Sequence, residues 1–151
     1  MSSLINEKLV NLNIKENNPS EVIRELGELI HSDNRLNDFD GYYQAVLDRE
    51  AEVSTAIGFG IAIPHGKTEF VKDTSIAFGR SETGIEWKGF DSDPVNIVIL
   101  LAVPEEAKGD QHLQIIASIS RKLIHEEFRN TLMVADEKEI VKLISESIDL
   151  K

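Results

Sequence analysis

The sequence contains no cysteine in its 151 residues. Disulfide bonds, a thiolate nucleophile and cysteine-based metal sites are therefore excluded, and we expect a protein of the reducing cytoplasm. Long hydrophobic stretches are also missing. The longest run, residues 97–103, is far too short to cross a bilayer, and the amino-terminal residues have neither the basic nor the apolar segment of a signal peptide. We therefore expect no membrane insertion.

Basic residues are scarce compared with acidic ones. The chain has 16 lysines and arginines against 27 aspartates and glutamates, which gives a net charge of -11. Such a surface repels nucleic-acid phosphates and anionic membranes, so neither is an expected partner. It attracts a basic partner protein instead, although solubility alone accounts for most of these carboxylates.

The pattern of apolar residues predicts a single domain over residues 1–151, since the chain can bury one core and shows no linker or repeat. Helical spacing and capping residues predict helices at 20–32, 39–48, 110–123 and 126–134, and a last helix after Asp136. Strands are predicted at 9–14, 61–63, 74–80, 84–88 and 95–103, with a turn at 91–94 and a polar loop at 105–110.

The order of these elements predicts the fold class. Residues 95–103 are almost continuously apolar, which is typical of a central strand covered on both faces. Helices alternate with strands, so we expect an α/β fold with three α/β/α layers, in which helices flank both faces of the sheet. The hairpin-like segment at 75–103 indicates a mixed central sheet. Gly58 and Gly60 predict a loop or bulge ahead of the strand at 61–63.

The most informative stretch is Ile61-Ala62-Ile63-Pro64-His65-Gly66. Its apolar residues predict a short buried strand, which Pro64 ends because it fixes φ and has no N–H. Gly66 permits a sharp turn or a close approach to a ligand. His65 is thus held on stiff backbone where an apolar strand meets solvent, and this arrangement presents an imidazole with little conformational freedom to lose. From the local sequence alone, a purely structural role for His65 remains an alternative.

The segment from Arg49 to Gly66 resembles the active-site segment of the fructose/mannitol class of enzyme IIA, from the bacterial sugar phosphotransferase system. That family's signature has an acidic or amide residue, a six-residue gap, an aliphatic-small pair, two free positions, and aliphatic-Ala-aliphatic-Pro-His-small. The sequence places Glu50, Ile57-Gly58 and residues 61–66 at these positions. The combination is specific, and the resemblance extends over nearly the whole chain.

The resemblance implies a phosphate relay. The histidine that matches His65 accepts a phosphoryl group from the phosphocarrier HPr as phosphohistidine and passes it to the IIB unit (EIIB) of a sugar permease. The expected activity is that of a phosphotransferase with no cofactor and no metal, and the chain would be a free-standing fructose-type component. The resemblance also places the histidine that matches His112 beside the phosphorylated one, as a donor to the phosphoryl group.

The chemistry of these residue types agrees with a relay. An imidazole with a pKa of about 6.5 is mostly neutral near neutrality, and its second ring nitrogen is expected to donate to a carbonyl or carboxylate. Arg49 is a natural phosphate clamp because a guanidinium offers two parallel donors; the alternative is a helix-end arginine on a surface carboxylate. His112 falls in the first turn of a predicted helix, which favours anions. The hydroxyls of Ser54 and Thr55 are further candidates.

Other residues have simpler interpretations. His31 and His125 match no functional motif and are expected to be structural. The apolar side chains of Phe59, Ile61 and Ile85 either belong to the core or form a hydrophobic rim that partners bury when they dock.

Two other functions remain open. The nearer one is a regulatory version of the same domain, whose histidine reports its phosphorylation state to other proteins. The more distant one is a metal-dependent hydrolase with His65, His112 and carboxylates as ligands. The sequence contains no His-Glu-x-x-His spacing, which disfavours this alternative. The sequence does not indicate the sugar, the phosphorylated ring nitrogen, or whether the chain is a monomer or a weak dimer.

Overall fold

The computed structural model describes residues 3–88, 93–107 and 110–148. The helices are α1 (Pro19–Ser32), α2 (Phe39–Glu52), α3 (Gln111–Leu123), α4 (Glu126–Leu132) and α5 (Glu137–Ser147), with a short 3-10 helix, η1 (Glu7–Leu9). The strands are β1 (Val10–Asn11), β2 (Ala56–Gly58), β3 (Ile61–Ala62), β4 (His65–Thr68), β5 (Ser75–Ile85) and β6 (Val95–Pro104).

The strands form one six-stranded sheet with β6 at its centre. The order is β1-β5-β6-β3-β2, and β4 also pairs with β6. β6 runs antiparallel to β5 and parallel to β3 and β4, so the predicted mixed sheet is confirmed. All side chains of β6 are buried except the half-buried Asn96, as its continuous apolar sequence predicts.

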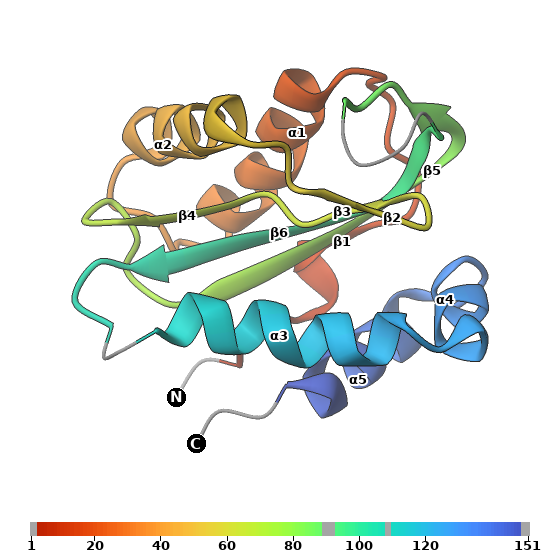
Figure 1. The fold of residues 1–151 in the computed structure, drawn as a ribbon. Coiled ribbons are helices and arrows are strands. Elements are labelled where there is room, and N and C mark those ends of the chain that lie inside the picture. Colours follow the sequence, from red (N-terminus) through yellow and green to blue (C-terminus); the bar gives the residue numbers. More distant parts are fainter. Residues whose placement is uncertain (1–2, 89–92, 108–109, 149–151) are drawn as a thin grey trace.

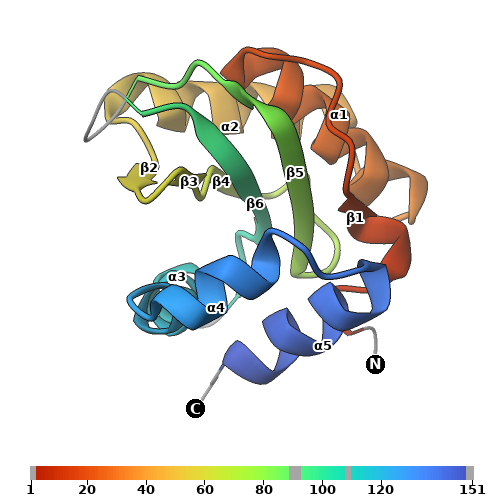
Figure 2. The same ribbon diagram turned by 90° about the vertical axis from the view of Figure 1, so that its right-hand side faces the viewer.

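Helices cover both faces of this sheet, which confirms the three-layer α/β/α fold (Figure 1). α1 and α2 lie side by side on one face, where α1 packs on β5 and α2 on β4. α3, α4 and α5 lie on the other face, as the rotated view in Figure 2 shows, with α3 against β6 and α5 against β1. The two faces together bury the core, which includes Leu26 above the sheet and Ile119 below it.

Two helices begin where their capping residues predict. The side chain of Asn18 accepts a hydrogen bond from Glu21 N at 3.0 Å, and Pro19 occupies the first turn of α1. Asp136 accepts from Glu139 N at 2.9 Å at the start of α5. Asp110 stands at the N-cap position of α3, but its side chain makes no capping hydrogen bond.

Some predicted boundaries were wrong. α2 continues to Glu52 rather than ending at Asp48, because residues 49–52 are good helix formers without glycine or proline. The predicted strands at 74–80 and 84–88 are one strand, β5, whose pairing is irregular between Arg80 and Ile85. The strand predicted at 9–14 is reduced to β1 and follows η1. The turn at 91–94 and the loop at 105–110 lie partly outside the described residues.

The proline corner behaves as predicted and adds one strand that the sequence did not predict. β3 ends at Ala62, one residue before the predicted end. The carbonyl of Pro64 accepts from Leu101 N at 3.0 Å, so the chain stays beside β6 and resumes pairing as β4. The predicted bulge lies in the β2–β3 pair, between Ala56 and Gly58. Phe59 follows it with a φ of 60°, in the left-handed region.

α2 approaches β4 closely, and two residues make this possible. The hydroxyl of Tyr42 is fully buried and donates to Leu101 O at 2.7 Å. Burial also raises the pKa of Tyr42, so the hydroxyl stays a donor. A Cβ atom at Gly66 would lie 3.0 Å from Val46 Cγ2 and 3.2 Å from Tyr42 Cε1. The lack of a side chain at Gly66 therefore lets the first two turns of α2 lie over the start of β4.

Replacing Tyr42 by Phe tests this attachment. We expect Tyr42→Phe to lower the free energy of unfolding by about 1–2 kcal/mol, because a buried donor is lost and its carbonyl partner is left with one bond fewer. Chemical denaturation measures the change as a lower midpoint with an unaltered slope. Tyr43→Phe, which removes a half-buried hydroxyl bonded to Ser20 O, is the matched control and should have a smaller effect. A Tyr42→Phe protein as stable as the parent would contradict this view of α2.

Candidate functional site

His65 opens β4 directly after the proline corner, opposite Leu101 of β6. Its side chain is half-buried, and its Nδ1 atom lies 3.0 Å from the carbonyl oxygen of Ile63. A carbonyl can only accept, so Nδ1 carries the proton and Nε2 keeps the lone pair. The two-residue step across Pro64 thus fixes the tautomer of the ring.

The surroundings of His65 favour its neutral form. Burial lowers the pKa of His65, and the hydrogen bond to Ile63 opposes this shift. The positive charge of Arg49 and the His112 ring lower the pKa further, whereas the carboxylate of Glu50 raises it. The balance lies below the ordinary value of 6.5, so the imidazole is neutral and nucleophilic near neutrality.

His112 lies beside His65, although 47 positions separate them in sequence. It belongs to the first turn of α3, and the two ring centroids are 6.1 Å apart. Burial and the charge of Lys67 lower the pKa of His112. Its Nδ1 atom is buried without a hydrogen-bond partner among the described residues, and such an unpaired atom is unusual in a protein interior.

Arg49 lies in the last turn of α2, close enough to affect the charge state of His65. Its Nη1 atom donates to Val53 O at 2.8 Å. Within the part of the chain that the structure describes, Arg49 forms no ion pair with a carboxylate, as the alternative interpretation would require. The remaining donors of its guanidinium can therefore bind an anion. The structure brings together all three residues that the sequence proposed for the site.

Two neighbouring residues, Glu50 and Lys67, were given no chemical role from the sequence, although Glu50 matches the family signature. Glu50 accepts three hydrogen bonds, from Thr55 N, Thr55 Oγ1 and Trp87 Nε1. Lys67 is exposed on β4, two positions after His65, and therefore projects from the same side of the strand. The sequence shows Lys67 two positions after His65, but it did not predict that both residues lie in a strand. Nothing in the sequence indicated that Trp87, two residues after the end of β5, would bond to Glu50.

The two hydroxyl candidates are already hydrogen-bonded within the protein, and the two remaining histidines lie outside the site. The hydroxyl of Thr55 donates to Glu50 Oε1 at 2.6 Å, and Ser54 Oγ accepts from Ala56 N at 3.2 Å. His31 is exposed and packs against Phe39 in a tilted arrangement, with 5.7 Å between the ring centroids. His125 is exposed at the N-cap of α4. Neither His31 nor His125 belongs to the site.

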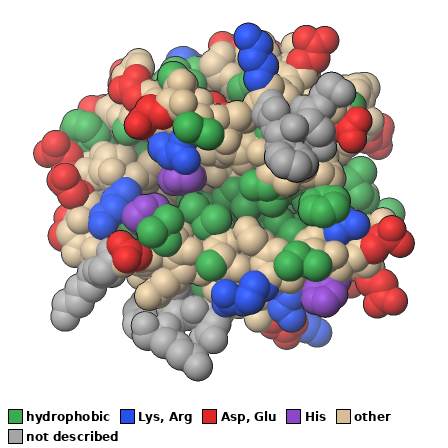
Figure 3. Space-filling model, viewed as in Figure 1, with side chains coloured by type: hydrophobic (Ala, Val, Ile, Leu, Met, Phe, Trp, Pro, Cys, Tyr) green, Lys and Arg blue, Asp and Glu red, His purple; other side chains and the backbone are tan. Residues whose placement is uncertain are grey.

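The apolar surface next to the histidines differs from the predicted rim. Ile61 and Ile85 are buried in the core, so only Phe59 of the three is exposed, at 62%. Phe59 stacks on the guanidinium of Arg129 at 4.1 Å, and Arg129 in turn donates to the carbonyl of Ile124. Ile124 and Leu113 are also exposed, at 69% and 51%. Figure 3 shows hydrophobic side chains gathered across this face, with two adjacent histidines at one side of them.

Neither a metal centre nor a membrane anchor is evident in the described ranges. Among residues 3–88, 93–107 and 110–148, no group of three or more His, Asp, Glu or Cys side chains is placed to hold a metal ion. No described helix combines the length and the apolar character that crossing a membrane requires. The metal-dependent hydrolase therefore gains no support from the geometry.

A neutral imidazole whose Nε2 keeps its lone pair, with a second imidazole beside it and a guanidinium nearby, can act as a nucleophile toward a phosphoryl group. Residues 3–147 match the family described as "Phosphoenolpyruvate-dependent sugar phosphotransferase system, EIIA 2". The chain belongs to this family of phosphoryl carriers, whose members act as phosphotransferases in the sugar phosphotransferase system.

Three of the curated relatives are named as fructose-specific or fructose-like. The chain is 42% identical over 108 residues to the fructose-specific EIIA component of Haloferax volcanii, which covers 72% of this chain and 70% of that protein. It is 34% identical to the fructose-like EIIA component of Escherichia coli, over 92% and 93% of the two chains. It is 36% identical to the fructose-specific EIIABC component of Bacillus subtilis over 93% of this chain, but spans only 22% of that protein.

Solved structures of two kinds share the fold. The nitrogen regulatory protein IIA-Ntr from Neisseria meningitidis aligns with a TM-score of 0.84 and 27% identity, over 93% of this chain and 96% of that one. The enzyme IIA for mannitol from Escherichia coli, solved in complex with its phosphorylated enzyme IIB, aligns with a TM-score of 0.79 and 26% identity, over 94% and 97% of the two chains.

The lowered pKa of His65 can be measured directly. We expect the imidazole signals of His65 in an NMR titration to have a midpoint below 6.5, because burial and Arg49 disfavour the cation. Arg49→Gln should move this midpoint upward, since one of the opposing charges is removed. A parent midpoint above 6.5, or one that Arg49→Gln leaves unchanged, would contradict the described electrostatics.

Proposed function

We propose that this chain accepts a phosphoryl group from HPr on His65 and passes it to the EIIB unit of a fructose/mannitol-class permease, in the cytoplasm. The observation that carries the proposal is the hydrogen bond from Nδ1 of His65 to the Ile63 carbonyl, which leaves Nε2 as the only ring nitrogen with a lone pair. Family membership and the fructose-type relatives support the same assignment.

The transfer is a simple exchange of bonds. The lone pair of Nε2 attacks the phosphorus of the phosphohistidine on HPr, and an N–P bond forms while the donor's N–P bond breaks. The bonding pair returns to the donor ring. Positive charge develops on the ring of His65, and the carbonyl of Ile63 stabilises it through Nδ1–H. The second transfer runs in the same manner toward a nucleophile of EIIB.

Arg49 and His112 stabilise the phosphoryl oxygens in this proposal. Phosphoryl transfer needs positioning and charge stabilisation more than covalent help from the protein. Arg49 has donors that no described carboxylate occupies, and it lies against His65 from the α2 side. His112 approaches from the α3 side, and its buried Nδ1 has no described partner. Lys67 adds a further positive charge near His112.

The exposed apolar surface suits the docking of protein partners. Leu113 adjoins His112 in sequence, and the exposed side chain of Phe59 is linked to Ile124 at the end of α3 through Arg129. A partner that covers this surface excludes water from His65, which strengthens the electrostatic interactions that the transfer uses. The net charge of -11 favours a carrier with basic residues around its own histidine. The solved mannitol complex offers a precedent for EIIB as the second partner.

Incubation with phosphoenolpyruvate, enzyme I and HPr tests the proposal. We expect intact-mass analysis to detect one added phosphoryl group that is labile in acid and stable in alkali, as a phosphoramidate is. His65→Ala should lose it. His125→Gln, which changes an exposed histidine outside the site, should retain it. Phosphorylation of His65→Ala, or a phosphoryl group on His31 or His125 of the parent, would contradict the assignment.

A regulatory role is the second candidate, because the nitrogen regulatory protein from Neisseria meningitidis shares the fold with a TM-score of 0.84. The two roles differ in what happens after phosphorylation. A sugar-transporting carrier passes labelled phosphate on to a cognate EIIB, whereas a regulator does not. Failure to transfer to any fructose- or mannitol-class EIIB would favour the regulator.

A further inference from the structure

The carboxylate of Glu50 has an unusually complete set of partners for a half-exposed side chain. It accepts from Thr55 N at 2.9 Å, from Thr55 Oγ1 at 2.6 Å and from the indole Nε1 of Trp87 at 3.0 Å. Glu50 stands in the last turn of α2, where the helix dipole disfavours a negative charge. Its position is therefore explained by these hydrogen bonds and not by the helix.

A continuous series of hydrogen bonds leads from Glu50 to His65. The N–H and hydroxyl of Thr55 donate to Glu50, and the carbonyl of the same residue accepts from Ile63 N at 3.1 Å. The carbonyl of Ile63 then accepts from Nδ1 of His65 at 3.0 Å. Ile63 thus orients the imidazole through its carbonyl, while its N–H is bonded to Thr55, the residue that Glu50 holds.

Arg49, the residue before Glu50 in α2, is also hydrogen-bonded to the segment 53–55. Nη1 of Arg49 donates to Val53 O, two residues before Thr55. Consecutive residues of one helical turn therefore fix both ends of the segment 53–55. A shift of this segment moves the guanidinium and the imidazole relative to one another.

We propose that Glu50 is a positioning residue for the phosphoryl transfer proposed above, holding Thr55 and Ile63 so that the His65 ring keeps its Nδ1–H tautomer and its orientation toward Arg49. Trp87, which follows the end of β5, donates a further hydrogen bond to the same carboxylate. This proposal concerns the geometry of the free protein, and its effect on rate rests on the proposed function.

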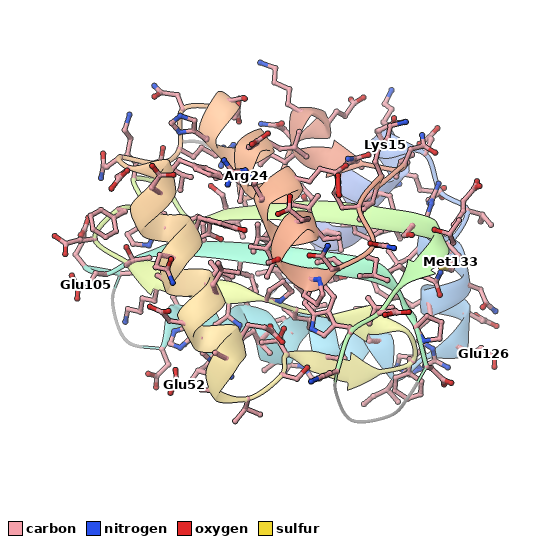
Figure 4. The ribbon with its side chains drawn as sticks, turned by 90° about the horizontal axis from the view of Figure 1, so that it is seen from above. Lys15, Arg24, Glu52, Glu105, Glu126 and Met133 are labelled. Atoms are coloured by element: carbon pink, nitrogen blue, oxygen red, sulfur yellow. The ribbon has the colours of Figure 1, made fainter. Side chains whose placement is uncertain are left out.

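The decisive comparison is between Glu50→Gln and Glu52→Gln. Both remove one negative charge from the end of α2, where Figure 4 labels Glu52. Glu52 is exposed and forms no side-chain hydrogen bond among the described residues. In single-turnover transfer from phosphorylated HPr, we expect Glu50→Gln to lower the maximal rate about tenfold with an unchanged half-saturating HPr concentration, since positioning acts on the transition state. Glu52→Gln should stay within about twofold of the parent on the same scale.

Ring-nitrogen NMR separates positioning from a merely structural role. In the free parent, the nitrogen signals of His65 should report one tautomer, with the proton on Nδ1. Glu50→Gln should shift these signals toward a mixture of tautomers, lower the His65 midpoint because a nearby negative charge is gone, and move the single indole N–H signal of Trp87. Glu52→Gln should leave all three in place.

The outcomes are distinguishable. Equal rates and equal ring signals in Glu50→Gln and the parent would overturn the proposal, as would a loss of stability without any change at His65. If Glu50→Gln does not fold, Thr55→Val removes only the 2.6 Å hydroxyl bond and is expected to shift the His65 signals in the same direction. If the parent accepts no phosphoryl group from HPr, the proposed function fails, but the ring-nitrogen spectra still decide the role of Glu50.

Discussion

The hydrogen bond between Nδ1 of His65 and the carbonyl of Ile63 is the interaction on which the site depends. It joins residues on either side of Pro64, so the proline corner places donor and acceptor 3.0 Å apart with almost no flexible chain between them. β3 and β4 hold the corner against the buried strand β6 on both sides. The ring is therefore oriented before any partner arrives, and little conformational freedom is lost when transfer occurs.

The three layers meet at this corner, and each contributes one part of the site. The sheet contributes His65, α2 contributes Arg49, and α3 contributes His112 from the opposite face. The close approach of α2 requires the buried hydroxyl of Tyr42 and the missing side chain of Gly66. The chain has a net charge of -11, yet it gathers a guanidinium and two imidazoles at one point. An anionic phosphoryl group is therefore stabilised better at this point than elsewhere on the acidic surface.

The sequence predicted the layers and the position of His65 at the end of a buried strand, because both follow from local patterns. The apolar run of β6, the Asn18-Pro19 helix start and the Pro64 corner are each visible within a few residues. The sequence did not predict β4, since its four residues form a strand only through pairing with β6. The hydrogen bonds of Glu50 were not predicted either, although Glu50 matches the family signature, because its partner Trp87 lies 37 positions away and no periodicity connects them.

Nitrogen–phosphorus NMR of the phosphorylated, isotope-labelled protein tests the central claim most directly. The protonated Nδ1 leaves only Nε2 able to form the N–P bond, so phosphorus coupling should appear at Nε2 of His65, with the proton retained on Nδ1. Phosphorus attached to Nδ1 would show that the bond to Ile63 breaks during transfer, and it would contradict the proposed mechanism.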